Sequence, residues 1–99
     1  MSFVTTQPEA LAAAAGNLQG IGSTMSAQNA AAAAPTTGVT PAAADEVSAL
    51  TAAQFAAPAQ MYQAVSAQAA AIHEMFVSTL ATSSGSYAAT EAANAAAAG

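Results

Sequence analysis

The first third of the chain carries a stripe of larger apolar residues at helical spacing. They are Leu11, Leu18, Ile21 and Met25, with Ala14 between the two leucines. At about 100° per residue these positions share one side of an α-helix. Two prolines and a glycine then fall between Pro35 and Pro41, a combination typical of a loop. The pattern predicts a helix over residues 7–34 and a loop over residues 35–41.

The second apolar pattern is longer and wider. Its central stripe consists of Phe55, Tyr62, Val65, Ile72, Phe76 and Leu80, and it is widened on one side by Val47, Leu50, Met61 and Met75. Together these residues sweep an arc of about 160°, whereas the seam with a single helix is narrower. The pattern predicts a helix over residues 42–81, and one neighbouring helix cannot cover its whole apolar face.

Local signals mark where both helices begin. Thr6 and Glu9 have the spacing of a capping box, in which each residue's side chain accepts from the other's backbone N–H. Pro8 suits the first turn, where its missing N–H leaves no bond unmade. The second helix is expected to begin after the loop, with Asp45 or Thr40 as its N-terminal cap.

Pro58 conflicts with the second helical pattern. It lies between Phe55 and Tyr62 on the apolar side, and it cannot donate to the carbonyl of Gln54. A proline inside a helix costs about 3 kcal/mol and kinks or splits the helix. The sequence therefore predicts a bend near Gln54–Pro58, within one domain.

Small residues fill the other side of the first helix. They are Ala13, Gly16, Gly20, Ala27, Ala31 and Ala34. Two interpretations stay open: a smooth face that another helix approaches closely, or an alanine-rich face turned to solvent.

Residues 83–99 hold little that can be buried. Tyr87 is their only side chain larger than a carboxylate, and Glu91, one helical turn later, is their only charge. Such a segment cannot offset the entropy of ordering it. Ser83 to Ser86 are predicted to end the second helix and to leave a C-terminal tail outside the fold.

Composition excludes several functions. The chain has no Lys or Arg, five acids and no Cys, and alanine makes up 34 of its 99 residues. We expect one small domain over residues 1–99 with little core material. Without cations the chain cannot neutralise phosphates, which excludes nucleic acid binding. The same lack of cations leads us to expect neither a polybasic membrane patch nor a secretory signal peptide. Polar residues break every long apolar window, so we expect no transmembrane helix.

Candidate catalytic chemistry is sparse. His73 is the single histidine, its neighbour Glu74 points about 100° away on a helix, and Asp45 lies too far along the same helix to join them. We predict no enzyme activity, metal, cofactor or small-molecule substrate. His73 is interpreted as a structural or surface residue, with a pH-sensing contact as the alternative.

Two helices joined by a short loop share one seam and have no interior of their own. The predicted fold is all-α, an antiparallel two-helix hairpin that completes a helical bundle with a partner protein. An uncovered apolar face of this size usually marks an interaction surface. Self-association into a homodimeric four-helix bundle would cover the same face and stays open.

The chain resembles a known family at several points. These are the start Met1–Val4, the Pro8-Glu9 pair, two long helices around Pro35–Pro41, and the Tyr87-x-x-x-Glu91 motif after the second helix. In these features it is similar to the PE family of mycobacterial type VII secretion substrates. The resemblance spans essentially the whole chain and is greatest to short members, consisting of the PE domain alone, that are associated with the fifth ESX-type system.

That resemblance implies a 1:1 heterodimer with a PPE protein, in which the two apolar stripes form the partner interface. It implies export of the folded pair to the cell surface or beyond, after a cytosolic stage in which an EspG-type chaperone holds the PPE partner. Tyr87 and Glu91 match the C-terminal export signal, which lies beside a Trp-x-Gly turn that the partner must supply, because this chain has no tryptophan. An alternative role is in the passage of small solutes across the outer membrane.

Overall fold

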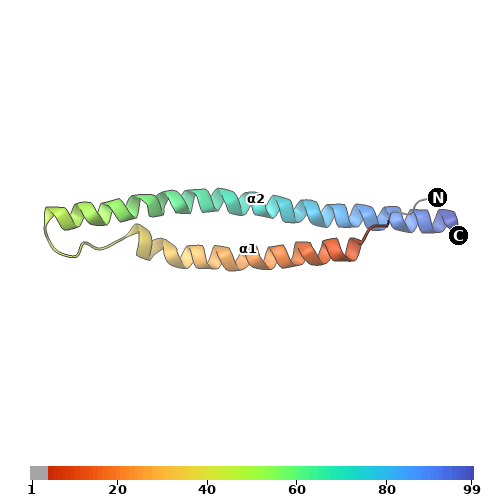
Figure 1. Cartoon of the computed structure of the whole chain (residues 1–99), viewed down its shortest axis with the longest axis horizontal. Helices are drawn as coiled ribbons and strands as arrows, with labels where there is room; N and C mark the ends of the chain where they lie inside the picture. The colour runs from red at the N-terminus through yellow and green to blue at the C-terminus, as the bar shows by residue number, and fades with distance from the viewer. Residues whose placement is uncertain (1–4) are drawn as a thin grey trace. The chain divides into compact units, whose positions relative to one another are not determined.

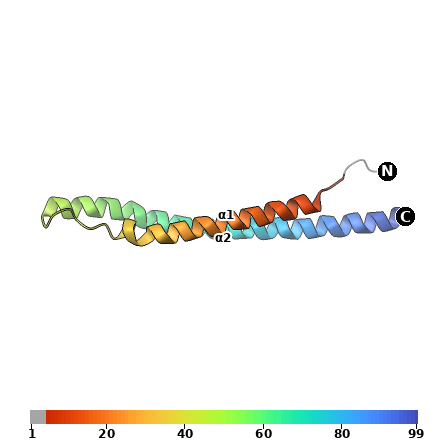
Figure 2. The ribbon, with the colours of Figure 1, turned by 90° about the horizontal axis from the view of Figure 1, so that it is seen from below.

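The protein is helical in nearly all of the residues that the structure describes. The computed structural model describes residues 5–99 and contains two helices, α1 (Pro8–Thr37) and α2 (Glu46–Ala98), with no strand in that range (Figure 1). The chain divides into two compact units, of which one joins Met1–Gly22 to His73–Gly99 and the other is Ser23–Ile72. Within each unit a segment of α1 runs antiparallel to a segment of α2 (Figure 1 and Figure 2). The prediction of an all-α chain with two antiparallel helices is confirmed.

The start of α1 differs from the predicted capping box. Pro8 is the first helical residue, and the carbonyl of Gln7 accepts from the N–H groups of Ala10 and Leu11 at 3.0 and 3.1 Å. Gln7 therefore holds the cap position. Thr6 lies one residue too early for the box, and its hydroxyl donates to Glu91 instead. Glu9 stays exposed in the first turn, where a carboxylate is stabilised by the helix dipole.

The end of α1 lies beyond the predicted loop boundary. The helix contains Pro35 and runs to Thr37, whereas the sequence predicted its end near residue 34. The hydroxyl of Thr36 donates to the carbonyl of Ala32, and that of Thr37 to Ala33, each at 2.6 Å. In addition, the N–H of Gly38 donates to the carbonyl of Ala34 at 3.0 Å, which gives a partner to one of the last carbonyl groups of the helix. The loop accordingly covers residues 38–45 instead of 35–41.

Asp45 caps α2, which was one of the two predicted alternatives. Its Oδ1 accepts from the N–H of Ser48 at 2.7 Å, and its backbone carbonyl accepts from Ala49 at 3.1 Å. The Ser48 hydroxyl also donates to Oδ2 at 3.1 Å. One side chain thus satisfies an N–H group that the first turn leaves unpaired, and its negative charge lies at the positive end of the helix.

Pro58 does not divide α2. The helix is continuous through the proline, so the chain does not split there (Figure 1). Pro58 lies thirteen residues into the helix and still forfeits the bond to the carbonyl of Gln54. The predicted local bend stays a prediction.

The predicted end of α2 near Ala81 is wrong. The helix continues through Ser83–Ser86 to Ala98, so residues 83–98 are not a tail outside the fold. Ser84 explains part of the difference, because it is only 8% exposed and its hydroxyl donates to the carbonyl of Pro8 at 2.7 Å. Residues 92–98 are nearly all alanine, the strongest helix former. A tertiary contact and high local propensity together carry the helix through the serines and Gly85.

Candidate interaction surface and C-terminal site

The seam between the helices is lined by small side chains in the unit Ser23–Ile72. Ala52 is 8% exposed and is the buried apolar residue of this unit. The half-buried residues of the α2 segment follow at steps of three and four: Ala56, Ala59, Gln63, Ser66 and Ala70. This spacing is that of a helical seam, and the residues at it are small or polar. The α2 segment therefore turns its small side, not its large apolar side, toward α1.

Asn29 joins the two helices of this unit through polar contacts. The phenol of Tyr62 donates to Oδ1 of Asn29 at 2.8 Å, and the amide of Gln63 donates to the backbone carbonyl of Asn29 at 3.0 Å. Tyr62 keeps 53% of its surface exposed, and its hydroxyl group makes the contact with α1. Neither Asn29 nor Gln63 was predicted to join the helices. These bonds fix the rotation of one helix segment against the other, because a hydrogen bond is directional.

In the other unit, small and larger residues share the seam. Ala15 is 5% exposed, and Leu11, Leu18, Val77 and Leu80 are half-buried around it. Three of these, Leu11, Leu18 and Leu80, were predicted to face a partner protein. They are half-buried within the chain itself, and their contact with a partner stays a prediction.

His73 makes a close contact with α1 in this unit. Its Nε2 lies 2.6 Å from the carbonyl oxygen of Leu18, and because a carbonyl can only accept, Nε2 carries the proton. A Cβ at Gly22 would lie 2.7 Å from both Nε2 and Cδ2 of the ring. His73 is thus a structural residue that fills the space beside a glycine, in agreement with its interpretation as structural. The sequence did not single out Gly22.

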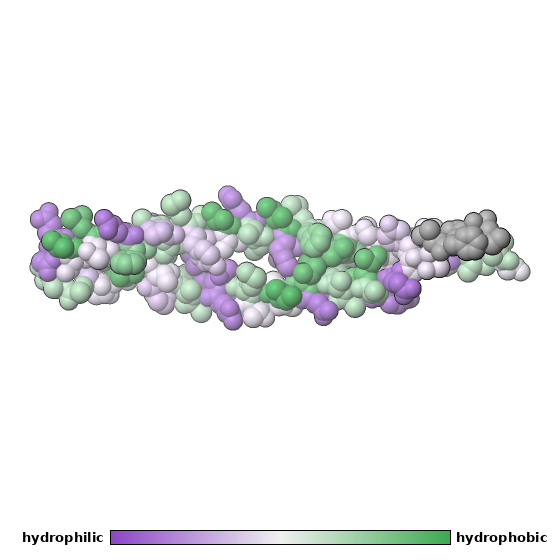
Figure 3. All heavy atoms as spheres, in the orientation of Figure 1, coloured by the Kyte–Doolittle hydropathy of each residue, from purple (hydrophilic) through white to green (hydrophobic). Residues whose placement is uncertain are grey.

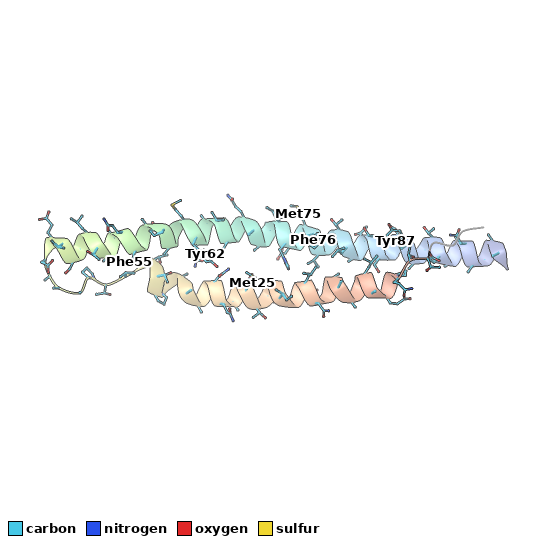
Figure 4. All side chains as sticks on the ribbon, in the orientation of Figure 1. Met25, Phe55, Tyr62, Met75, Phe76 and Tyr87 are labelled. Carbon is cyan, nitrogen blue, oxygen red and sulfur yellow. The ribbon has the colours of Figure 1, made fainter. Side chains whose placement is uncertain are left out.

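Most of the large apolar residues remain exposed outside these seams. In the unit Ser23–Ile72 the exposed ones are Met25, Val47, Leu50, Phe55, Met61, Tyr62, Val65 and Ile72, and in the other unit they are Ile21, Met75, Phe76 and Tyr87. Their exposed fractions range from 46% for Tyr87 to 74% for Val47. We call this set without Tyr87 the outer apolar face. Met75 projects from the side of α2 turned away from α1 (Figure 4), and apolar groups lie open at the surface along α2 (Figure 3).

The small-residue side of α1 is exposed. Ala13, Gly16, Gly20, Ala27, Ala31 and Ala34 all lie at the surface of this chain, and both interpretations of this side stay open. A Cβ at Gly16 would meet nothing within 4 Å. Close approach between the helices takes place at Gly22 instead.

A second site lies where the segment before α1 meets the last part of α2. The hydroxyl of Thr6 donates to Oε1 of Glu91 at 2.9 Å, and Ser84 donates to the carbonyl of Pro8. Glu91 is half-buried, whereas Tyr87 remains 46% exposed. The two residues of the predicted export motif lie one turn apart on α2, and the carboxylate is already hydrogen-bonded within the chain. This site brings both ends of the described chain together.

Within residues 5–99, no group of three or more His, Asp or Glu side chains is placed to hold a metal ion. No helix in the same range is long and apolar enough to span a membrane.

Comparison with known proteins identifies the family. The family model described as PE matches residues 4–94. The chain is also 74% identical over 98 residues to the PE family protein PE13 of Mycobacterium tuberculosis, with 99% of each protein covered. The chain belongs to the PE family. The Pro8-Glu9 pair and the two long helices that suggested the resemblance are thus features of a PE protein.

Other PE relatives are longer. PE8 of Mycobacterium tuberculosis is 60% identical over 98 residues, and the matched part is 36% of its length. PE_PGRS33 of the same organism is 66% identical over 96 residues, which are 19% of its length. This PE protein therefore spans nearly all of PE13 but about a fifth to a third of these two relatives. What the longer proteins share with it is the helical region described above.

Proposed function

We propose that this PE protein is a non-enzymatic interaction protein that forms a 1:1 heterodimer with a PPE protein through the outer apolar face. The observation that supports the proposal is the exposure of many large apolar side chains: eleven of them outside Tyr87 stay more than half exposed, while the most buried residues are Ala15, Ala52 and Ser84. Fully burying one such side chain contributes about 1.5–3 kcal/mol. A face with many of them is stable in water only when another protein covers it.

A PPE protein is the proposed occupant because the chain belongs to the PE family, whose members are expected to pair in this way. Helices of the partner would pack along α2 and extend each unit into a bundle. The absence of Lys and Arg means that the chain offers no cations for ion pairs. Association would depend on apolar burial and on shape, and it would change little with salt concentration.

Coexpression tests this proposal. The full chain is produced alone and together with PPE proteins encoded in the same genome, and the soluble products are measured by light scattering. We expect aggregation of the chain alone and a soluble 1:1 complex with one PPE protein. A soluble, cooperatively unfolding monomer would overturn the proposal, and a stable homodimer of four helices would replace it with self-association.

We also propose that Tyr87 and Glu91 carry the signal by which a type VII secretion system exports the pair, after an EspG-type chaperone has held the PPE partner in the cytosol. The exposed ring of Tyr87 and the carboxylate of Glu91 lie one turn apart on α2, so a single recognition surface can contact both. Tyr87→Ala is expected to abolish export and to leave the heterodimer intact. Thr90→Ala, at an exposed position between them, is the matched control and should be exported normally.

The outer apolar face also supports a second candidate function. In it, the PE/PPE pair acts at the outer membrane in the passage of small solutes. Two observations favour it: the outer apolar face is wide, and the chain contains no Lys or Arg. Uptake of labelled solutes by cells that lack the protein separates the two roles. Unchanged uptake would exclude solute passage.

A further inference from the structure

The segment before α1 reaches the last part of α2 through one specific hydrogen bond. Thr6 and Glu91 are 85 positions apart in the sequence, and the Thr6 hydroxyl lies 2.9 Å from Oε1 of Glu91. Both side chains are half-buried, whereas the neighbouring Thr5 is exposed. A hydrogen bond to a charged acceptor in a partly buried position is stronger than one between neutral groups in water. The contact is therefore suited to hold the Glu91 carboxylate in one orientation.

Tyr87 lies on the same side of α2 as this contact. Ser84 and Glu91 are seven residues apart and so share one side of the helix, and both bond to residues at the start of the described chain. Tyr87 lies three residues after Ser84 and four before Glu91, which places it on that side as well. Glu91 thus continues the line of Ser84 along α2, and the exposed ring of Tyr87 lies beside that line. The segment that precedes α1 lies beside them.

We propose that Thr6 is a positioning residue of the export signal, which holds the Glu91 carboxylate so that it is presented together with the ring of Tyr87. The inference rests on the proposed export function of Tyr87 and Glu91. A glutamate side chain alone rotates freely, and its carboxylate has about four acceptor sites. One bond from Thr6 fixes the orientation and leaves acceptor sites for an export component. The signal is then formed by both ends of the chain and not by the C-terminal motif alone.

Substitution of Thr6 in the full chain, coexpressed with its PPE partner in a mycobacterial host, tests the inference. Thr6→Val keeps the shape of the side chain and removes the hydroxyl, and we expect it to lower the exported fraction at least about tenfold, the effect of losing one hydrogen bond to a charged group. Thr6→Ser restores the hydroxyl and should restore export. Thr5→Val is the matched control and should be exported like the parent. The amount of heterodimer in the cytosol should be the same in all three.

A double-substitution cycle separates positioning from a general loss of structure. If Thr6 acts through Glu91, then Thr6→Val lowers export no further once Glu91→Ala is present. An additional loss in the double variant would overturn the inference, as would normal or increased export of Thr6→Val. If Thr6→Val is exported normally while Tyr87→Ala stays in the cell, only the role of Thr6 is overturned. The proposed function then remains intact. Normal export of Tyr87→Ala would overturn both.

Discussion

The imidazole of His73 occupies the space that a methyl group at Gly22 would need. A Cβ there would lie 2.7 Å from two ring atoms, while Nε2 of the same ring lies 2.6 Å from the Leu18 carbonyl. The Nε2 edge of the ring thus lies against the backbone of α1 at both Leu18 and Gly22. The glycine is therefore required by the histidine, and the two residues set how closely α1 and α2 approach in this unit.

Gly22→Ala is expected to destabilise the protein, although alanine is the better helix former by about 1 kcal/mol. The added methyl group must displace the ring, and overpacking of this kind costs about 1–3 kcal/mol. Chemical denaturation of the heterodimer at fixed concentration measures the change. Gly16→Ala is the matched control, because its Cβ would meet nothing within 4 Å, and it should stabilise the protein. A gain in stability from both variants would contradict the close contact.

His73→Ala should lower stability by about 1–3 kcal/mol, because it removes a hydrogen bond and leaves space beside Gly22. The informative variant is the combination with Gly22→Ala. Once the ring is absent, the added methyl group has room, so Gly22→Ala should become neutral or stabilising. A double-mutant cycle on unfolding free energies measures this coupling. Additive effects would show that the two residues do not share one space.

Asn29→Ala and Tyr62→Phe are expected to cost the same, about 0.5–1.5 kcal/mol each, because each removes one end of a single hydrogen bond. The double variant should lose no more than either single one. The bond from Gln63 survives in all of them, because it uses the backbone carbonyl of Asn29. Gln63→Ala should therefore add its own loss to that of Asn29→Ala. Independent losses from Asn29→Ala and Tyr62→Phe would contradict the contact.

Asp45→Ala should destabilise the first turn of α2 by about 1 kcal/mol, because the N–H of Ser48 loses its partner. Asp45→Asn keeps an acceptor oxygen for the N–H of Ser48 and should lose less, namely the contribution of the charge at the helix end and the exposed bond from the Ser48 hydroxyl. Hydrogen exchange of the amides at residues 46–49 measures the effect. Equal exchange rates in the parent and Asp45→Ala would show that this cap contributes nothing in solution.

Ile72→Asp is expected to weaken heterodimer formation at least about tenfold, because it removes a side chain whose full burial contributes about 1.5–3 kcal/mol and places a charge in the interface. Ile72 is 63% exposed in the structure. Ala67→Asp is the matched control, because it adds the same charge at an exposed position about 140° around the helix. Titration of labelled chain with the PPE partner measures both. Equal losses from the two variants would place the interface elsewhere.

Local signals in the sequence were sufficient for most of the secondary structure. The apolar spacing predicted both helices, and the acid at position 45 predicted the cap of α2, because these features act within a few residues of the chain. Two of the misplaced boundaries have a common cause. Thr6 and Ser84, at the start of α1 and past the predicted end of α2, each make a bond to a residue far away in the sequence: Thr6 to Glu91, and Ser84 to Pro8.

The sequence by itself determined that the protein has two helices, no cations, and more large apolar surface on α2 than one neighbouring helix can cover. Only the tertiary structure decided which side of α2 turns toward α1. Alanines and Gly22 allow close packing, and His73, Gln63 and Ser84 reach carbonyl groups of α1, so the small side forms the seam and the outer apolar face stays open. Periodicity describes how wide an apolar face is. Which side meets the other helix depends on contacts between residues far apart in the chain.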